Sequence, residues 1–181
     1  MRRAFRRPLR RAFAPDIPPL LQRANELMAT GDFAGAANSF EQLARAAEGR
    51  GGPRAPWFYL QAGRARVLAG QTAMGMDHLK RGLGLFAARG LPDRVFTAGQ
   101  RIVGELNQRG LSKEAQQISD YAKSLVPDFK PDVNQAAPAK RPPLPTHCPG
   151  CGAPVRADEV EWIDDVTAEC AFCGSPVRGE S

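Results

Sequence analysis

The four cysteines of this 181-residue chain constrain its fold more than any other feature of the sequence. All four lie in the last 34 residues, as the pairs Cys148-Pro-Gly-Cys151 and Cys170-Ala-Phe-Cys173, with 18 residues between the pairs. Two Cys-x-x-Cys pairs at this separation are typical of a site in which four thiolates bind one zinc ion. The sequence therefore predicts metal ligands at Cys148, Cys151, Cys170 and Cys173.

The residues around the cysteine pairs predict a small β structure. Gly152 and Gly174 each follow the second cysteine of a pair, where a tight turn can need a positive φ. Residues 159–163 and 166–169 are expected to form two short strands around the acidic turn Asp164-Asp165. With the cysteines, this pattern over residues 147–181 resembles a zinc ribbon of the rubredoxin-like type. The resemblance implies a structural Zn²⁺, because four cysteine ligands leave no open position for catalysis.

Other interpretations of the cysteines remain open at this point. A tetrahedral set of thiolates also suits iron, and the sequence does not decide between zinc and iron. A disulfide or a redox-active Cys-x-x-Cys is disfavoured, because no thioredoxin-like βαβ pattern surrounds the pairs. His147 precedes the first cysteine and is either a substitute ligand or a histidine of the preceding linker.

The charge of the C-terminal segment differs from that of many zinc ribbons. Residues 148–181 contain seven acidic side chains and two basic ones, Arg156 and Arg178. Phosphate groups would be repelled by such a surface. We therefore expect the ribbon to dock on protein or to cap another part of the chain, and not to bind nucleic acid. Trp162 is either an exposed anchor for a partner or the cover of the ribbon's own small core.

The net charge of +6 comes from an arginine-rich tail over residues 1–15. Six arginines lie there without any acidic residue, and the remainder of the chain is neutral. On a helix, Phe5, Leu9 and Phe13 would form one apolar stripe between arginines, although Pro8 interrupts a continuous helix. This tail could contact an anionic membrane, RNA or DNA, or the acidic ribbon, or it is simply a basic tail.

Residues 16–126 have the apolar periodicity of helices joined by turns. Turns are predicted at Gly31, Gly70 and Gly110, which lie 39 and 40 residues apart. Proline at a helix start predicts that one helix begins near Pro56, and Ser112 is a plausible N-cap of the last helix. Pro127 is expected to end that helix. The recurrence indicates three helical hairpins.

The first hairpin resembles the tetratricopeptide repeat (TPR) in its pattern Ala24, Leu27, Gly31-Asp32-Phe33, Ala36, Phe40 and Leu43. The second departs from that pattern, since Gly75 and Gly82 stand where alanine or a larger residue is usual. The resemblance implies a TPR-like α-solenoid whose first helices line a peptide-binding groove. Four arginines fall on those first helices, and either receive acidic groups or are solvated: Arg64, Arg66, Arg94 and Arg101.

Between the hairpins and the ribbon, residues 127–146 contain six prolines and are expected to form a flexible, semi-extended linker. Its basic end, Lys140-Arg141, could fold back on the acidic ribbon. The predicted organisation is thus a basic tail over 1–15, a TPR-like domain over 16–126, a linker over 127–146 and a zinc ribbon over 147–181. The fold class is mainly α with a small β unit.

The sequence contains no recognisable catalytic motif. No nucleophile–base pair or phosphate-binding glycine loop is visible, and His78 and His147 form no site with other residues. We therefore expect a non-enzymatic adaptor that binds protein or peptide partners and no small-molecule substrate. Alternatives are a nucleic-acid-associated regulator and a peripheral membrane scaffold, each acting through the tail. Grouped thiols and the lack of a long apolar run predict a cytoplasmic protein. The partner and the oligomeric state are not predicted.

Overall fold

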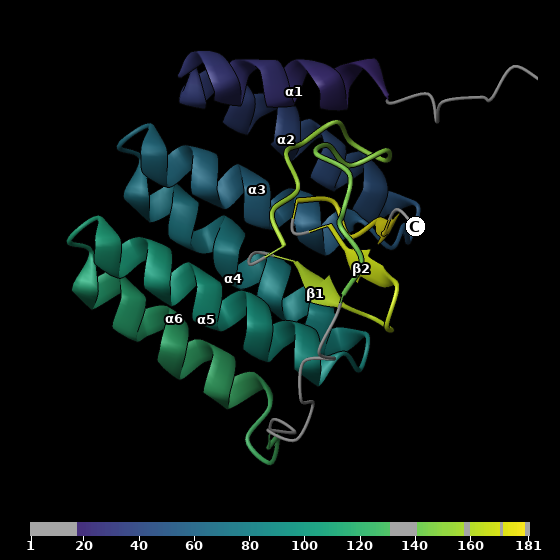
Figure 1. The fold of residues 1–181 in the computed structure, drawn as a ribbon. Coiled ribbons are helices and arrows are strands. Elements are labelled where there is room, and N and C mark those ends of the chain that lie inside the picture. The colour runs from purple at the N-terminus through teal and green to yellow at the C-terminus, as the bar shows by residue number, and fades with distance from the viewer. Residues whose placement is uncertain (1–17, 131–140, 158–159, 171, 180–181) are drawn as a thin grey trace, which may run out of the picture.

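The computed structural model describes residues 18–130, 141–157, 160–170 and 172–179. Within them, six helices are followed by a small antiparallel sheet, so the mainly helical class is confirmed (Figure 1). The helices pair as three hairpins that lie side by side, and we call them the helical stack. Their bounds are α1 Pro19–Thr30, α2 Phe33–Gly49, α3 Ala55–Leu68, α4 Thr72–Ala88, α5 Pro92–Gln108 and α6 Ser112–Leu125.

The three predicted turns have the expected backbone geometry. Gly31, Gly70 and Gly110 have φ values of +83°, +75° and +75°, which other residues rarely adopt. Asp32 caps α2 by accepting a hydrogen bond from the backbone N–H of Gly35 at 2.9 Å. The prediction that Ser112 is an N-cap was wrong. Ser112 is already the first residue of α6, and its side chain caps nothing, because the turn places Leu111 at the cap.

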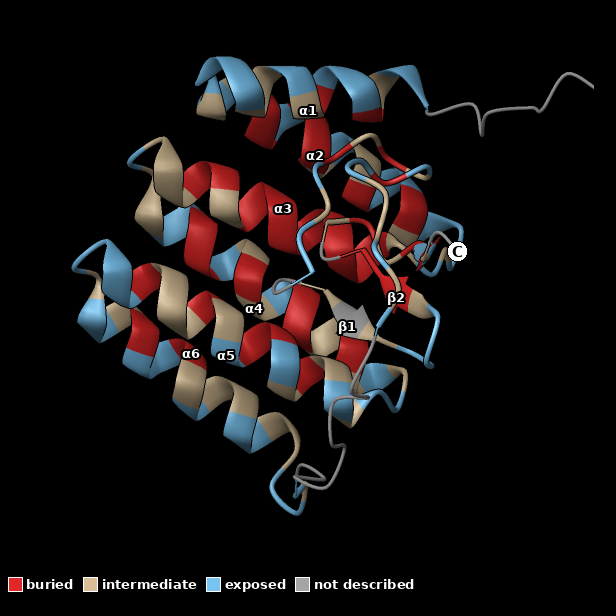
Figure 2. Ribbon diagram, in the orientation of Figure 1, coloured by how far each residue is buried: buried red, intermediate tan, exposed pale blue. Residues whose placement is uncertain are grey.

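Helix α3 is buried around nearly its whole circumference (Figure 2). Leu60, Ala62 and Ala65 have no exposed surface, and the polar Gln61 between them is 1 % exposed. Helices α2 and α4 pack against α3. The face that these two helices leave open is covered by the C-terminal residues, which lie over α3 in Figure 1. A helix whose apolar residues are spread around it without a polar stripe needs this complete cover.

The C-terminal module, which we define as the described residues from 141 to 179, contains a three-stranded antiparallel sheet in the order β1-β2-β3. Its strands are β1 Glu161–Trp162, β2 Thr167–Glu169 and β3 Pro176–Arg178. Trp162 pairs with Ala168, and Ala168 also pairs with Val177. The first two strands were predicted, although shorter than expected, and β3 was not.

Two local interactions shape this sheet. Asp164 accepts hydrogen bonds from the N–H groups of Val166 and Thr167 at 2.9 and 2.7 Å, which closes the acidic turn. These bonds lower the pKa of the Asp164 carboxyl. The guanidinium of Arg141, at the end of the predicted linker, lies 4.9 Å from the ring centre of Trp162, so this residue does contact the predicted ribbon.

Several predictions fall on other parts of the chain. Residues 1–17, with Phe5, Leu9 and Phe13, lie outside the described residues, as does Lys140. The bounds of the four predicted segments stay predictions. Among the described helices, none has the length and apolar character needed to cross a membrane.

Glycines bring α3 and α4 unusually close together. A Cβ on Gly75 would lie 2.7 Å from Cγ2 of Val67 and 2.9 Å from the carbonyl oxygen of Gly63. A Cβ on Gly82 would meet the carbonyl oxygen of Pro56 at 2.9 Å. These are the two glycines that depart from the TPR pattern. Their departure has a physical reason, because backbone here packs directly on backbone.

We expect Gly75→Ala and Gly82→Ala each to lower the free energy of unfolding by about 1–3 kcal/mol, because a backbone carbonyl cannot move aside as a side chain can. Gly104→Ala is the matched control, since a Cβ at this helical position meets nothing within 4 Å. It should raise stability by about 0.5–1 kcal/mol. Urea unfolding followed by circular dichroism measures all three, and equal effects at the three sites would contradict the close packing.

Candidate metal centre

Two similar turns present the four cysteines to one another. In each turn a backbone N–H donates to the sulfur of the first cysteine: Gly150 to Cys148 Sγ at 3.3 Å, and Phe172 to Cys170 Sγ at 3.4 Å. After each second cysteine comes a glycine with positive φ, +72° at Gly152 and +69° at Gly174, as predicted. The turns therefore orient each pair of sulfurs toward the other pair.

The structure brings all four predicted ligands together. Their sulfur atoms lie within 4.8 Å of one another, and each cysteine is at most 1 % exposed. Cys148 Sγ is 3.8 Å from Cys173 Sγ, and Cys151 Sγ is 3.8 Å from Cys170 Sγ. Every cysteine is free, at distances far above the roughly 2.05 Å of a disulfide. Four buried sulfurs at these separations can hold one metal ion.

Hydrogen bonds among the thiols separate their pKa values. Bonds with Cys151 and Cys170 lower the pKa of Cys148 from 9.0 to about 7. Bonds with its three neighbours, that with Cys148 first, also lower the pKa of Cys173. Bonds with Cys148, together with burial, raise the pKa of Cys151 and Cys170. Without a metal, these last two thiols therefore keep their protons at neutral pH.

A hydrogen-bonded chain connects one of the sulfurs to the helical stack. Arg54, which precedes α3, donates to Ser175 Oγ at 2.6 Å. Ser175 Oγ lies 3.2 Å from Cys173 Sγ, and both residues are buried. As a thiol, Cys173 donates to this oxygen; as a metal-bound thiolate it would instead accept the Ser175 hydroxyl proton, which Arg54 leaves free because a guanidinium has no acceptor. Such outer partners orient metal ligands and adjust their basicity.

Further contacts fix the C-terminal module on the helices. The Asn25 side chain of α1 donates to the backbone carbonyl of Cys151. Arg94 of α5 forms an ion pair with Glu169 of β2. Close to the second cysteine turn, Trp57 of α3 lies so near Gly174 that a Cβ there would fall 2.0 Å from the indole nitrogen. Helices α1, α3 and α5 thus form one docking face for the module.

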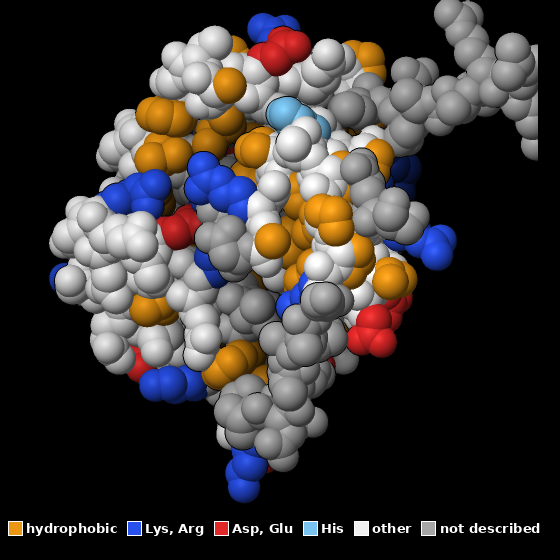
Figure 3. Space-filling model, viewed as in Figure 1, with side chains coloured by type: hydrophobic (Ala, Val, Ile, Leu, Met, Phe, Trp, Pro, Cys, Tyr) orange, Lys and Arg blue, Asp and Glu red, His pale blue; other side chains and the backbone are white. Residues whose placement is uncertain are grey.

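The four arginines of the first helices have different surroundings. Arg94 pairs with the module, and the guanidinium of Arg64 lies 5.6 Å from the ring centre of its Phe172 while pairing with Glu105 at 2.8 Å. Arg101 lies over the ring of Trp57. Arg66 pairs with Glu41 of α2 at 2.6 Å. Basic side chains accordingly gather beside the module in Figure 3.

The histidines stay outside the sulfur cluster. His147 is exposed, and its Nδ1 lies 3.1 Å from the hydroxyl of Thr146. His78 contacts Glu41 at 2.9 Å and stacks on Tyr59. Trp162 is half-buried, with the guanidinium of Arg141 over its ring. It is therefore neither a fully exposed anchor nor a fully buried core residue.

The sequence of α3 does indicate that a third part of the chain packs on this helix. Residues 55–68 have no polar stripe, which is typical of a helix covered on every side. Two neighbouring helices cannot provide that cover. No sequence pattern predicts the polar contacts that hold the module, because polar residues of these types usually lie at the surface. These contacts are made by Asn25, Arg54 and Ser175.

We expect the metal affinity of this centre to fall as the pH falls, because protons compete for the thiolates. Above pH 7, Cys151 and Cys170 must each lose a proton, so log K should rise by about 2 per pH unit. Below about pH 7, Cys148 also becomes protonated, and the slope should approach about 3. Competition with a chelator of known affinity between pH 6 and 8.5 measures this slope; a flat profile would contradict the cluster.

Removing the metal should also release the module from α3. Trp57 is 7 % exposed, and we expect its fluorescence to shift to longer wavelength when a strong chelator is added. A Trp162→Phe background leaves Trp57 as the reporter. Addition of Zn²⁺ should restore the original spectrum. Full metal release without a spectral shift would show that the module docks independently of the metal.

Comparisons of the chain with protein-family models, with curated proteins and with solved structures found no match. The support for a metal centre in this chain is therefore the geometry of its own residues. Four cysteines from two turns converge on one buried point, and a docking face of three helices holds them there.

Proposed function

We propose that this protein is a non-enzymatic adaptor, in which a TPR-like helical stack binds a partner protein and a zinc ribbon completes the stack. The paired helices, the small residues between them and the turn glycines support the TPR-like interpretation. Cysteine turns next to a three-stranded sheet support the ribbon. The four free thiols suit a reducing compartment, and we propose the cytoplasm.

Zinc fits the sulfur geometry well. In a tetrahedral site with Zn–S bonds of about 2.3 Å, the sulfurs lie about 3.8 Å apart. The Cys148–Cys173 and Cys151–Cys170 separations are both 3.8 Å. With four protein ligands no position is left for a substrate, so we assign the ion a structural role. Metal analysis of the purified protein distinguishes zinc from iron.

The observation that carries the adaptor proposal is that the helical stack already holds a polypeptide. Helices α1 and α5 and the residue before α3 contact the C-terminal module at a backbone carbonyl, a carboxylate and a hydroxyl. Proteins use these same groups when they recognise one another. A stack that binds one polypeptide through such contacts can bind a second one at an apolar surface that the C-terminal module leaves exposed.

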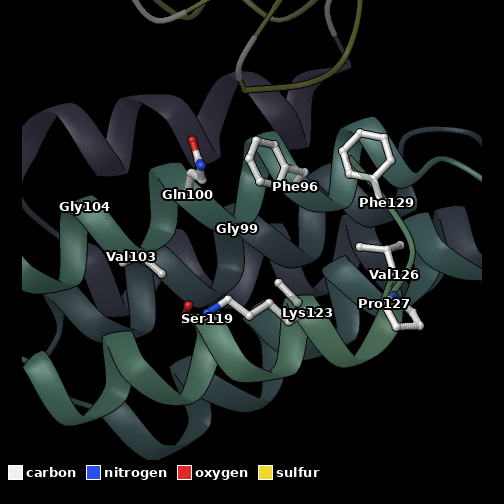
Figure 4. A pocket seen from close by; sticks show the side chains of 11 residues that line it. Phe96, Gly99, Gln100, Val103, Gly104, Ser119, Lys123, Val126, Pro127 and Phe129 are labelled. Carbon is white, nitrogen blue, oxygen red and sulfur yellow. The ribbon is translucent and has the colours of Figure 1, made fainter. Parts of the chain in front are cut away.

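Such a surface lies at the α5–α6 end of the stack (Figure 4). A cavity of about 650 Å³ opens between these helices and the segment that follows α6. Phe96 and Phe129 contact each other at one end of it, with ring centres 5.7 Å apart. The remaining lining residues are mostly apolar or small, with a polar rim: Gly99, Gln100, Val103, Gly104, Ser119, Ala122, Lys123, Val126 and Pro127.

An amphipathic helix of a partner protein fits this cavity best. Helical hairpins bury their apolar faces against the next repeat, and α5 and α6 have no following helix among the described residues. A partner helix would take that place and bury the aromatic pair. Lys123 at the rim is exposed and would pair with an acidic residue of the partner.

The test is an affinity purification from native extract with two variants. Val103→Asp places a charge in the cavity, and we expect recovery of true partners to fall about tenfold or more. Met74→Asp is the matched control, because Met74 is 47 % exposed on α4, away from the cavity. Thermal unfolding shows whether both variants remain folded. Partners lost equally from both variants, or from neither, would argue against this site.

A further inference from the structure

A second cavity lies where the C-terminal module meets α1 and α3. It has a volume of about 550 Å³, within the range of about 300–1,000 Å³ that is usual for ligand sites. Met28, Phe40 and Phe172 give it an apolar interior. Its polar lining comes from Gln22, Asn25, Glu26, Gln61 and His147.

Gln61 makes this cavity more than a packing defect. The residue is 1 % exposed, and its amide Nε2 has no hydrogen-bond partner among the described residues. A buried amide donor without an acceptor is costly, and native proteins rarely keep one. Because Gln61 lines the cavity, an occupant with a carbonyl oxygen would satisfy it.

The lining defines the chemistry of the occupant. Asn25, which also lines the cavity, already donates to a backbone carbonyl, that of Cys151. An apolar interior requires apolar side chains, and Glu26 favours a cation near α1. Together these features indicate a polypeptide that carries both aromatic or aliphatic residues and positive charges.

We propose that this cavity binds the chain's own N-terminal segment, residues 1–17. That segment combines Phe5, Leu9 and Phe13 with six arginines, and has no acidic residue before Asp16. Its apolar residues match the interior of the cavity, and its arginines match Glu26 and the acidic module.

The connection to α1 also allows this placement. Residue 18 is the N-cap of α1, and the cavity begins at Gln22, about one helical turn later. Phe13 precedes Pro18 by five residues, which span up to about 17 Å when extended. Glu26 lies about 12 Å along the helix from Pro18. Phe13 can therefore reach the cavity within the same molecule.

A photocrosslink in the full chain tests the proposal. With p-benzoylphenylalanine in place of Phe13, we expect an intramolecular crosslink to the tryptic peptide 24–45, which contains Met28 and Phe40. Glu26→Gln and Gln61→Met should each lower the crosslink yield several-fold. Asp77→Asn is the matched control, because it removes an exposed carboxylate from α4, away from the cavity, and it should leave the yield unchanged.

Hydrogen exchange gives a second measurement that needs no change in the cavity. We expect Phe13→Ser to speed amide exchange over residues 22–29, and Arg10→Gln with Arg11→Gln to do so less. Crosslinks confined to residues 163–166 of the module, or to the α5–α6 end, would overturn the proposal. So would crosslinks only between chains, or exchange rates that depend on the arginines alone.

Discussion

The cover that helix α3 requires brings the helical stack and the C-terminal module together in one core. Its apolar residues are spread around the helix without a polar stripe, so α3 is stable only when nearly all of its surface is removed from water. Helix α2 covers one face, and α4 approaches another so closely that glycines form the contact. The remaining face belongs to the C-terminal module. A segment far from α3 in the sequence thus completes the same core.

The polar contacts at this junction explain why the module docks in one orientation. Apolar burial is non-directional, whereas hydrogen bonds and ion pairs need defined partners. Asn25, Arg54 and Arg94 come from three successive regions of the stack, and each meets a different chemical group of the module. The acidic composition of the module is therefore matched by its position beside arginines. The charged and polar pairs thus determine which face of the stack the module binds, and burial of apolar surface supplies most of the free energy of docking.

Short-range patterns in the sequence predicted the cysteine cluster and the helical hairpins well. Cysteine spacing sets the turn geometry directly, and a turn such as that at Gly70 depends on a backbone angle that few residues adopt. The docking of the two parts depends on contacts between residues far apart in the sequence, such as Asn25 and Cys151, which are 126 positions apart. No local pattern encodes such a pair. Strand β3 was missed because it is three residues long and begins with Pro176, which is unfavourable inside a strand.

The hydrogen-bonded chain from Cys173 through Ser175 to Arg54 couples metal binding to the stability of the helices. A ligand that binds only the folded state stabilises it, by about 2.7 kcal/mol when its free concentration is a hundred times its Kd. An ion held by these four thiolates would pass part of that stabilisation to α3 through the docked module. The amount of intact protein in a cell, and its lifetime against proteolysis, would then follow the supply of the metal.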